Sequence, residues 1–183
     1  MNSDEHHLIE LHRDCPAIAI PSGQPLTLGR GDRVMVVQTL GGSFTVQSDR
    51  SGLARIDDAD ADALGLADEP LGASPAASGP FDLQQVIDQL RTVYDPEIPI
   101  NVVDLGLIYS CDARPLPGGG QRVEITMSMT APGCGMGDVL RDEACAKVRG
   151  VPDVREVDVE LVWDPPWDPS RLSDEGRLEL GLY

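Results

Sequence analysis

Positive charge is scarce in this chain. Its 183 residues carry 14 Lys and Arg against 31 Asp and Glu, a formal net charge of −17. Nucleic acids and anionic membranes both attract a basic protein face, so this balance argues against either of them as a partner. No apolar run approaches the roughly 20 residues that a membrane-spanning helix needs. We therefore expect a protein that binds neither nucleic acid nor membrane.

The four cysteines lack the spacing of the common thiol motifs. Cys15, Cys111, Cys134 and Cys145 form no Cys-x-x-Cys pair and no disulfide scaffold, so we expect reduced thiols and a cytoplasmic protein. All three histidines lie in the first twelve residues, far from the last three cysteines. A Cys–His dyad and dithiol redox chemistry are both disfavoured. We expect that the protein is not an enzyme.

Aromatic residues make up only 4% of the chain, which indicates a modest core for its first part. Residues 14–66 are short apolar runs separated by turn residues, a pattern that predicts a small β-rich module, either a compact barrel or a meander. Asp58, Asp60 and Asp62 have the spacing of a calcium loop. Ala63, however, occupies the position at which that loop needs glycine. We expect the acidic start of a helix there.

A second domain is predicted over residues 81–163, after a linker rich in Pro, Ala, Ser and Gly over residues 67–80. Its first helix begins with a loose capping box formed by Asp82 and Gln85. The order of elements is α-β-β-α-β, which predicts an α+β fold, a two-layer sandwich, followed by a Trp/Pro-rich tail over residues 164–183. The expected strands are Leu105 to Ala113, Arg122 to Thr130, and a third that alternates from Val157 to Trp163.

Cys134 is the most informative residue of this domain. The strict alternation of residues 122–130 predicts a strand, and the helical spacing from Met136 onward predicts a helix. The turn between them places the Cys134 thiol at or just before the helix N-terminus, where unpaired N–H groups favour the thiolate. A thiolate is both a nucleophile and a metal ligand. A small structural cysteine in a crowded turn is the alternative.

Acidic residues gather around the loop that follows the first helix of the domain. Asp95 and Glu97 flank Pro96, and Asp104 follows a few residues later. If this loop lies beside Cys134, carboxylate oxygens and a thiolate would together suit iron or zinc. Under that hypothesis, Cys134, Asp95 and Glu97 would be the candidate ligands of the metal.

Two motifs in this region resemble those of the metal–sulfur cluster biosynthesis domain family. The resemblance covers about residues 81–163. Flanking stretches resemble the SufT-type assembly factors of that family, namely residues 38–46 with residues 60–65 on one side and Trp163 to Trp167 on the other. The first motif contains Asp95, Pro96, Glu97, Asn101 and Asp104, and the second contains Thr130, Pro132 and Cys134.

The resemblance implies a factor that helps to mature iron–sulfur proteins, with the same α-β-β-α-β fold. It implies that Cys134 is the functional cysteine and that an iron–sulfur cluster or iron is bound transiently. The implied partners are the iron–sulfur assembly machinery and client apoproteins.

One cysteine cannot hold a cluster alone, because a cluster needs about four ligands. We therefore expect a homodimer or a complex with an assembly partner, and we expect the region of Trp163 and Trp167 to be an exposed apolar docking patch. Two alternatives stay open. One is a metal-free adaptor between scaffold and clients, and the other is a thiol enzyme in which the helix end and Asp95 or Glu97 activate Cys134.

Overall fold

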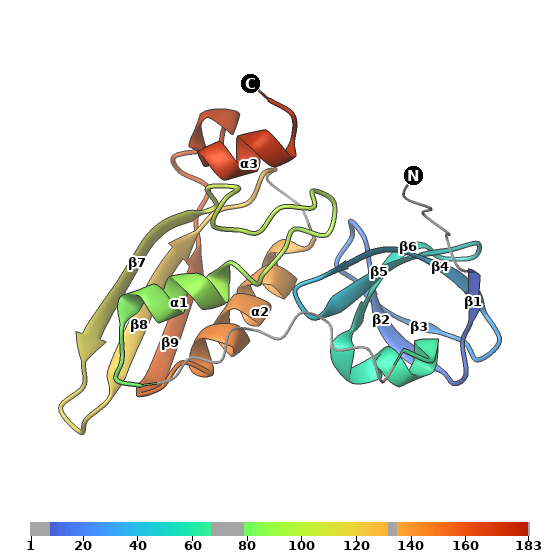
Figure 1. The fold of residues 1–183 in the computed structure, drawn as a ribbon, viewed down its shortest axis with the longest axis horizontal. Coiled ribbons are helices and arrows are strands. Elements are labelled where there is room, and N and C mark those ends of the chain that lie inside the picture. The colour runs from blue at the N-terminus through green and yellow to red at the C-terminus, as the bar shows by residue number, and fades with distance from the viewer. Residues whose placement is uncertain (1–7, 67–78, 132–134, 183) are drawn as a thin grey trace. The chain divides into compact units, whose positions relative to one another are not determined.

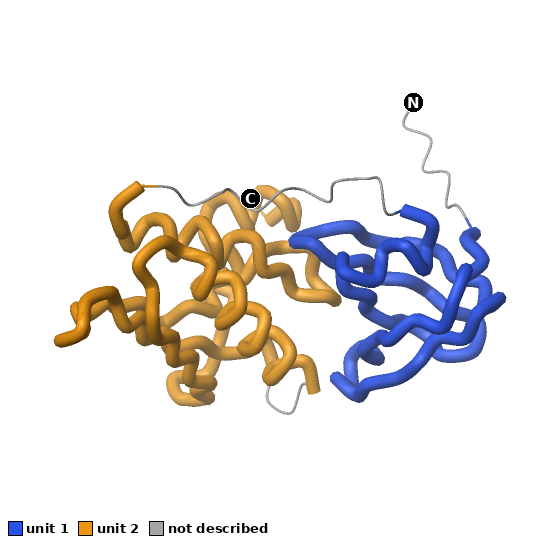
Figure 2. Tube along the Cα trace, turned by 90° about the horizontal axis from the view of Figure 1, so that it is seen from below, with its two compact units in different colours: residues 1–73 blue, residues 74–183 orange. Residues whose placement is uncertain are grey.

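The chain folds into two compact units, residues 1–73 and 74–183 (Figure 2). The computed structural model describes residues 8–66, 79–131 and 135–182. Each unit has its own hydrophobic core, and the content of helix and strand is mixed, as the predicted α+β class requires. Among the helices in these described ranges, none is long and apolar enough to cross a membrane.

The first unit is a six-stranded antiparallel sheet with the strand order β1-β4-β5-β6-β2-β3 (Figure 1). Its first strand begins at Leu8, earlier than the start predicted at residue 14. Gly41 and Gly42, with φ of 65° and 82°, make the two-residue turn between β4 and β5, since both central positions of such a turn need positive φ. The strands are β1 Leu8–Glu10, β2 Cys15–Ala19, β3 Pro25–Leu28, β4 Arg33–Leu40, β5 Ser43–Ser48 and β6 Gly52–Asp57.

Cys15 belongs to the core of this unit. Its side chain is fully buried, next to apolar residues that include Leu28, Phe44 and Ile56. Burial raises the pKa of the Cys15 thiol to about 11, and its Sγ donates to the carbonyl of Pro16 at 3.4 Å. The thiol is therefore protonated at neutral pH and has a packing role.

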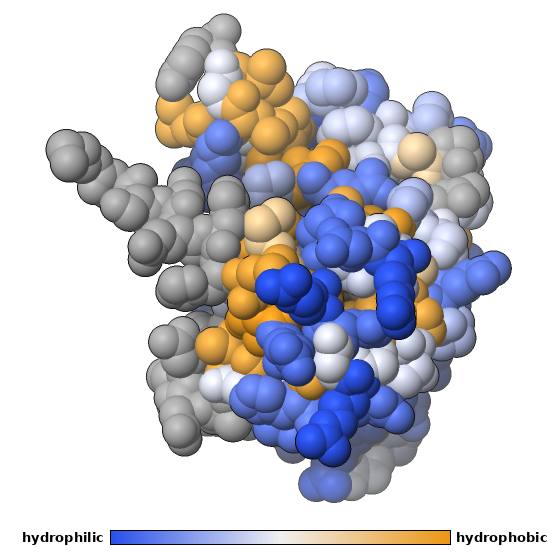
Figure 3. Space-filling model, turned by 90° about the vertical axis from the view of Figure 1, so that its right-hand side faces the viewer, coloured by the Kyte–Doolittle hydropathy of each residue, from blue (hydrophilic) through white to orange (hydrophobic). Residues whose placement is uncertain are grey.

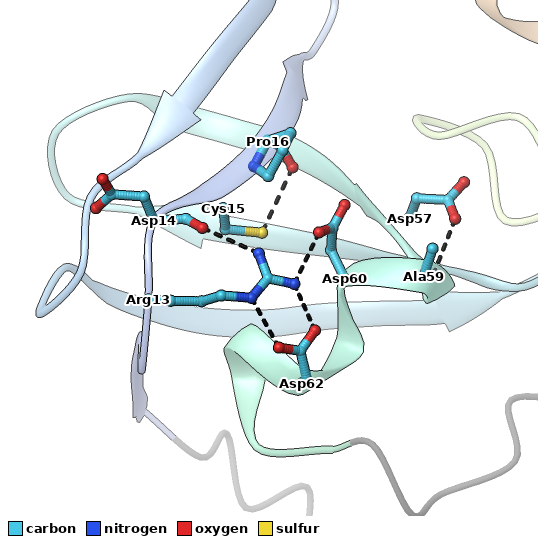
Figure 4. A network of polar contacts seen from close by, with 8 residues as sticks. All are labelled: Arg13, Asp14, Cys15, Pro16, Asp57, Ala59, Asp60 and Asp62. Carbon is cyan, nitrogen blue, oxygen red and sulfur yellow. Dashed lines mark hydrogen bonds and ion pairs between the residues drawn. The ribbon is translucent and has the colours of Figure 1, made fainter.

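The acidic helix start predicted at Asp58 is a 3-10 helix, η1, over Asp58–Leu64, and Arg13 binds its aspartates (Figure 4). The Arg13 guanidinium donates to Asp60 Oδ1 at 2.8 Å and to Asp62 Oδ2 at 2.7 Å. Two carboxylates that resembled calcium ligands in sequence are thus ion-paired with an arginine that precedes β2. The network fastens η1 to the start of β2.

Replacing Arg13 with glutamine should lower the stability of the first unit at neutral pH and have little effect in strong acid. The hydrogen bond from Arg13 is the largest cause that lowers the pKa of Asp62. A carboxyl whose folded-state pKa is depressed stabilises the fold above its unfolded value, about 3.9, and loses that contribution as the pH falls through the folded-state pKa. The measurement is urea unfolding followed by amide NMR signals of β5, at neutral pH and at about pH 2.5.

Arg33→Gln is the matched control, because Arg33 is an exposed arginine of the same unit. We expect its unfolding curve to follow the wild type at both pH values. An Arg13→Gln defect of the same size at both pH values would contradict a role through Asp62.

The second unit contains the predicted order α-β-β-α-β. Helices α1 and α2 lie against one face of a three-stranded sheet with the strand order β7-β8-β9 (Figure 1). Strands β7 and β8 form an antiparallel hairpin, whereas β9 runs parallel to β8, with α2 as the connection. The elements are α1 Leu83–Leu90, β7 Ile108–Pro115, β8 Gln121–Met127, α2 Gly137–Arg149, β9 Val154–Leu161, the 3-10 helix η2 Pro169–Arg171 and α3 Asp174–Glu179.

Local sequence signals explain why these elements form. Asp82 caps α1 through the predicted capping box with Gln85. In β8 the alternating side chains Val123, Ile125 and Met127 are buried and pack in the core with residues of both helices. Cys111, predicted to face inward, is half-buried against this core, and burial raises the pKa of its thiol to about 11.

Several predicted strand boundaries in this unit were wrong, among them the start of β9, which lies at Val154 instead of Val157. β7 begins at Ile108 instead of Leu105, because residues 101–107 form turns in which the Leu105 N–H bonds to the Asn101 carbonyl. β8 ends at Met127 instead of Thr130, and β9 ends at Leu161, so Trp163 lies outside the sheet. For β7 and β8 the cause is that buried apolar residues, Leu105, Leu107 and Met129, lie just outside the paired part of each strand.

Candidate functional site

Cys134 and Pro132 lie outside the described residues, so the structure fixes only what precedes and follows their turn. β8 leads into it, and α2 begins at Gly137, three positions after Cys134 in the sequence. The residue before α2, Met136, provides no side-chain hydrogen bond to the first turn of the helix. The first N–H groups of α2 therefore have no side-chain cap from Met136, which favours negative charge nearby.

Asp95 shapes the loop that follows α1. Its carboxylate is 4% exposed and accepts from the N–H groups of Glu97 and Ile98, at 2.8 and 2.9 Å. Burial raises the pKa of Asp95, and the two backbone donors partly offset that rise. Glu97 itself is exposed. Of the two carboxylates proposed as metal ligands, Asp95 thus closes a turn, and Glu97 faces solvent.

Asn101 and Asp104 fix the next part of the loop. The Asn101 side-chain amide donates to Asp104 Oδ2 at 2.7 Å, and its Oδ1 accepts from the N–H groups of Val103 and Asp104. The other oxygen, Asp104 Oδ1, accepts from the Ser173 hydroxyl at 3.0 Å. Both oxygens of Asp104 are therefore engaged within the protein, so its role is to hold the loop.

The C-terminal tail packs on this same loop. The indole N–H of Trp167 donates to the Leu105 carbonyl at 2.7 Å, and the Ser173 N–H donates to the Asp104 carbonyl at 2.9 Å. Arg171 Nε donates to the Gly106 carbonyl at 3.3 Å. We call residues 163–182 the tail strap, because they lie across residues 104–106.

Tyr109 gives the tail strap a second attachment on β7. Its hydroxyl donates to the Pro165 carbonyl at 2.9 Å, and the Arg171 guanidinium lies 3.8 Å above its ring centroid. Leu172, from the same segment, is buried in the core of the second unit. The tail is therefore an integral part of this unit.

The exposed position expected for Trp167 is wrong, because Trp167 is half-buried and packs against the core. Trp163 is exposed, at 45%. The other exposed apolar residues of the tail strap are Leu178, Leu180 and Leu182, in and after α3. Orange atoms at the top of Figure 3 lie at the height of α3 in Figure 1.

These parts meet at one end of the three-stranded sheet. The N–H of Ser128, just after β8, donates to the Leu107 carbonyl at 2.8 Å, and the Val162 N–H donates to the Met127 carbonyl at 2.8 Å. Gly137, at the start of α2, packs against Met129. The loop after α1, the end of β8, the start of α2 and the tail strap thus form one constellation.

Comparison with known proteins identifies the domain that carries this constellation. A profile described as iron–sulfur cluster assembly protein matches residues 83–160. A protein of Porphyromonas gingivalis named Fe-S protein maturation auxiliary factor is 43% identical over 99 residues, which cover 54% of this chain and 90% of that protein. The chain belongs to the iron–sulfur cluster assembly protein family.

Further members have the SufT name that the sequence motifs suggested. The Fe-S protein maturation auxiliary factor SufT of Staphylococcus aureus is 31% identical over 91 residues, which cover 49% of this chain and 98% of that protein. A solved domain of unknown function from Bacillus anthracis is 32% identical, with a TM-score of 0.48, over 55% of this chain and 92% of that one. The names of the maturation auxiliary factors, SufT among them, confirm the resemblance to SufT-type assembly factors.

The family profile contains both predicted motifs but ends before the tail strap. Asp95, Asn101, Asp104 and Thr130 all fall within residues 83–160. The tail strap begins at Trp163, beyond that range. This assembly-family domain is thus completed by contacts from outside the part of the chain that the profile matches.

The structure brings some predicted site residues together and leaves others untested. Asp95, Asn101 and Asp104 belong to one hydrogen-bonded loop, and Thr130 is half-buried shortly after β8. The predicted adjacency of Glu97 and Cys134 falls partly outside the described residues and stays a prediction. Within the described ranges, no group of three or more His, Cys, Asp or Glu could hold a metal ion.

Sequence reasoning missed Ser173 and Arg171. The one local signal at Ser173 is its role as the N-cap of α3, where its hydroxyl accepts from the Gly176 N–H at 3.0 Å. Its second partner, Asp104, is 69 residues away in the sequence. A contact between residues so far apart in the chain produces no periodic pattern in the sequence from which it could be predicted.

Proposed function

We propose that this protein matures iron–sulfur proteins by carrying or targeting a cluster, or iron, to client apoproteins through Cys134. Membership of the iron–sulfur cluster assembly protein family carries the proposal, because relatives that the chain covers almost completely are named Fe-S protein maturation auxiliary factors. The cluster is cargo in this role. The protein acts as a non-enzymatic factor, and its partners are the assembly machinery and the clients.

The geometry around the turn supports a site that holds its cargo weakly. Asp104 uses both carboxylate oxygens within the protein, and Asp95 closes a turn. Cys134 and the exposed Glu97 are then the side chains of the two motifs that remain for a metal. A cluster needs about four ligands, so the rest must come from a second copy or from a partner. Incomplete ligation favours transfer over storage.

We also propose that the protein acts in the cytoplasm as a homodimer or within an assembly complex. The spacing of the cysteines supports a reducing compartment. The incomplete set of ligands supports a shared site. The exposed side chain of Trp163 is available for docking, whereas Trp167 is held by Leu105.

A metal-free adaptor is the second candidate, and the engaged carboxylates of Asp95 and Asp104 favour it. In that case the protein would bring a scaffold and a client together, and the cluster would pass directly between them. The acidic surface and the turn at Cys134 would then contact proteins instead of metal.

Anaerobic reconstitution followed by transfer distinguishes these two roles. The purified chain is incubated with ferrous iron and sulfide, examined by visible absorption and Mössbauer spectroscopy, and mixed with an apo-dehydratase that requires a [4Fe–4S] cluster. A carrier gives a cluster signal and restores dehydratase activity. An adaptor gives no signal of its own but accelerates transfer from a loaded scaffold protein. If the chain neither holds a cluster nor accelerates transfer, the proposed maturation role is wrong.

A further inference from the structure

A hollow of about 360 Å³ lies at the other end of the three-stranded sheet, away from the turn of Cys134. This volume is within the range of small-molecule sites, about 300–1,000 Å³. β8 starts beside the hollow and ends at the turn, and the thirteen residues of α2 span about 20 Å between the two. The hollow is lined by Arg122, Arg149, Arg155, Glu156, Val157 and Asp158.

The carboxylates of this hollow are already paired with one of its arginines. Arg122 contacts Glu156 Oε2 at 3.4 Å and Asp158 Oδ2 at 3.3 Å, and its Nε lies 3.2 Å from Glu124 Oε1. Arg122 therefore offsets the negative charge of the wall that β9 contributes.

Arg149 and Arg155 have no such partner. Within the part of the chain that the structure describes, neither of them makes an ion pair or a side-chain hydrogen bond. The chain has a net charge of −17, so two unpaired guanidinium groups beside one hollow form a local concentration of positive charge in an acidic protein. They leave positive charge and hydrogen-bond donors directed at no protein acceptor.

The positions of both arginines are supported by the fold. A Cβ at Gly120 would lie 2.3 Å from Arg155 Cγ, so the absence of a side chain at Gly120 leaves room for the Arg155 stem against the β7–β8 hairpin. Arg149 is the last residue of α2, where the carbonyl groups of a helix end favour a cation.

We propose that this hollow is a binding site for an oxyanion, the phosphate or carboxylate group of a small ligand, held by Arg149 and Arg155. A guanidinium group offers a planar fork of donors that matches these oxyanions in a bidentate way. Glu156 and Asp158, which also line the hollow, provide acceptors for hydroxyl or amine groups of the same ligand. The site goes beyond the proposed maturation role and does not depend on Cys134.

The test is calorimetric titration of the full chain with pyrophosphate and, separately, with citrate, in a buffer free of other polyvalent anions. We expect at least one of the two to bind, and the tighter one identifies the group that the site prefers. The double variant Arg149→Gln/Arg155→Gln should lose at least about tenfold in affinity, which corresponds to 1.4 kcal/mol. Both side chains are exposed, so the variant should keep the thermal midpoint of the wild type.

The matched control is Arg30→Gln/Arg33→Gln, which removes the same charge from exposed arginines of the first unit. It should bind as the wild type does. In ¹⁵N NMR spectra, pyrophosphate or citrate should shift the amide signals of Gly120 and Gly150 most. Failure of the wild type to bind either anion, equal losses in the two double variants, or shifts confined to other residues would each overturn the site. None of these results bears on cluster transfer.

Discussion

Replacing Cys134 with serine should remove the cluster signal of the reconstituted protein and stop the maturation of client enzymes. A hydroxyl is a far weaker ligand for iron than a thiolate, so we expect transfer to fall by at least about tenfold, the factor that loss of even an outer ligand contact costs at metal sites. A thermal unfolding curve of each variant shows whether a loss of transfer comes from the ligand or from the fold. The measurement is the rate at which an apo-dehydratase regains activity.

Cys111→Ser and Cys145→Ser are the matched controls. Burial raises the pKa of Cys111 to about 11, so its thiol is protonated at neutral pH and cannot serve as a ligand without a large cost. Cys145 lies in α2, well past the helix start. Both variants should transfer clusters as the wild type does. Unchanged transfer in Cys134→Ser, or equal losses in all three variants, would mean that transfer has no specific requirement for Cys134, and the carrier role would then fail.

Replacing Gly106 with alanine should destabilise the second unit by about 2–5 kcal/mol. Gly106 has a φ of +70°, and a Cβ there would lie 2.1 Å from the Arg171 carbonyl oxygen. The left-handed conformation costs a residue with a side chain about 1–2 kcal/mol, and overpacking against backbone adds about 1–3 kcal/mol. Relief requires the tail strap to move away from the loop. Urea unfolding followed by tryptophan fluorescence measures the effect, since both tryptophans lie in the tail strap.

The variant Gly119→Ala separates the cost of the left-handed backbone conformation from the cost of overpacking. Gly119 has a φ of +85° in the β7–β8 turn, and a Cβ there would meet nothing within 4 Å. Its replacement should therefore cost only the backbone term, about 1–2 kcal/mol. The difference between the two variants measures the packing of the tail strap on Gly106. Equal costs would mean that the strap yields freely at this point and does not hold the loop.

The elements that sequence alone predicted are those defined by local patterns. The capping box of Asp82 and Gln85 spans four residues, and the alternation in β8 is a period of two, so each is visible in a short window. The same kind of local pattern gave a wrong prediction at Leu105, where a strand was expected to begin. Its burial and that of Leu107 imitate a strand, whereas the backbone there is turned, because the N–H groups of Leu105 and Leu107 donate to the carbonyls of Asn101 and Val102.

The candidate site was only partly predictable for a related reason. Asp95 and Asp104 were recognised as a group because they lie in one loop, but acidic clustering does not tell whether a carboxylate is free or engaged. Ser173 engages one oxygen of Asp104, and Trp167 packs on the core and donates to the Leu105 carbonyl. Ser173 and Trp167 both belong to the tail strap, a segment that has no repeat and no hydrophobic period. Only the folded chain reveals them.

The tail strap also affects the order in which the parts of the second unit can fold during synthesis of the chain. The Leu105 carbonyl receives its hydrogen bond from Trp167, which is synthesised 62 residues later. At about 5–20 residues per second, the loop that holds Asp95 and Asp104 waits several seconds on the ribosome for the segment that fixes it. The sheet and α2 can form during that interval, so the end of the domain that contains Cys134 is the last part of the fold to be completed. A newly made chain therefore gains its finished site only after its scaffold is already in place.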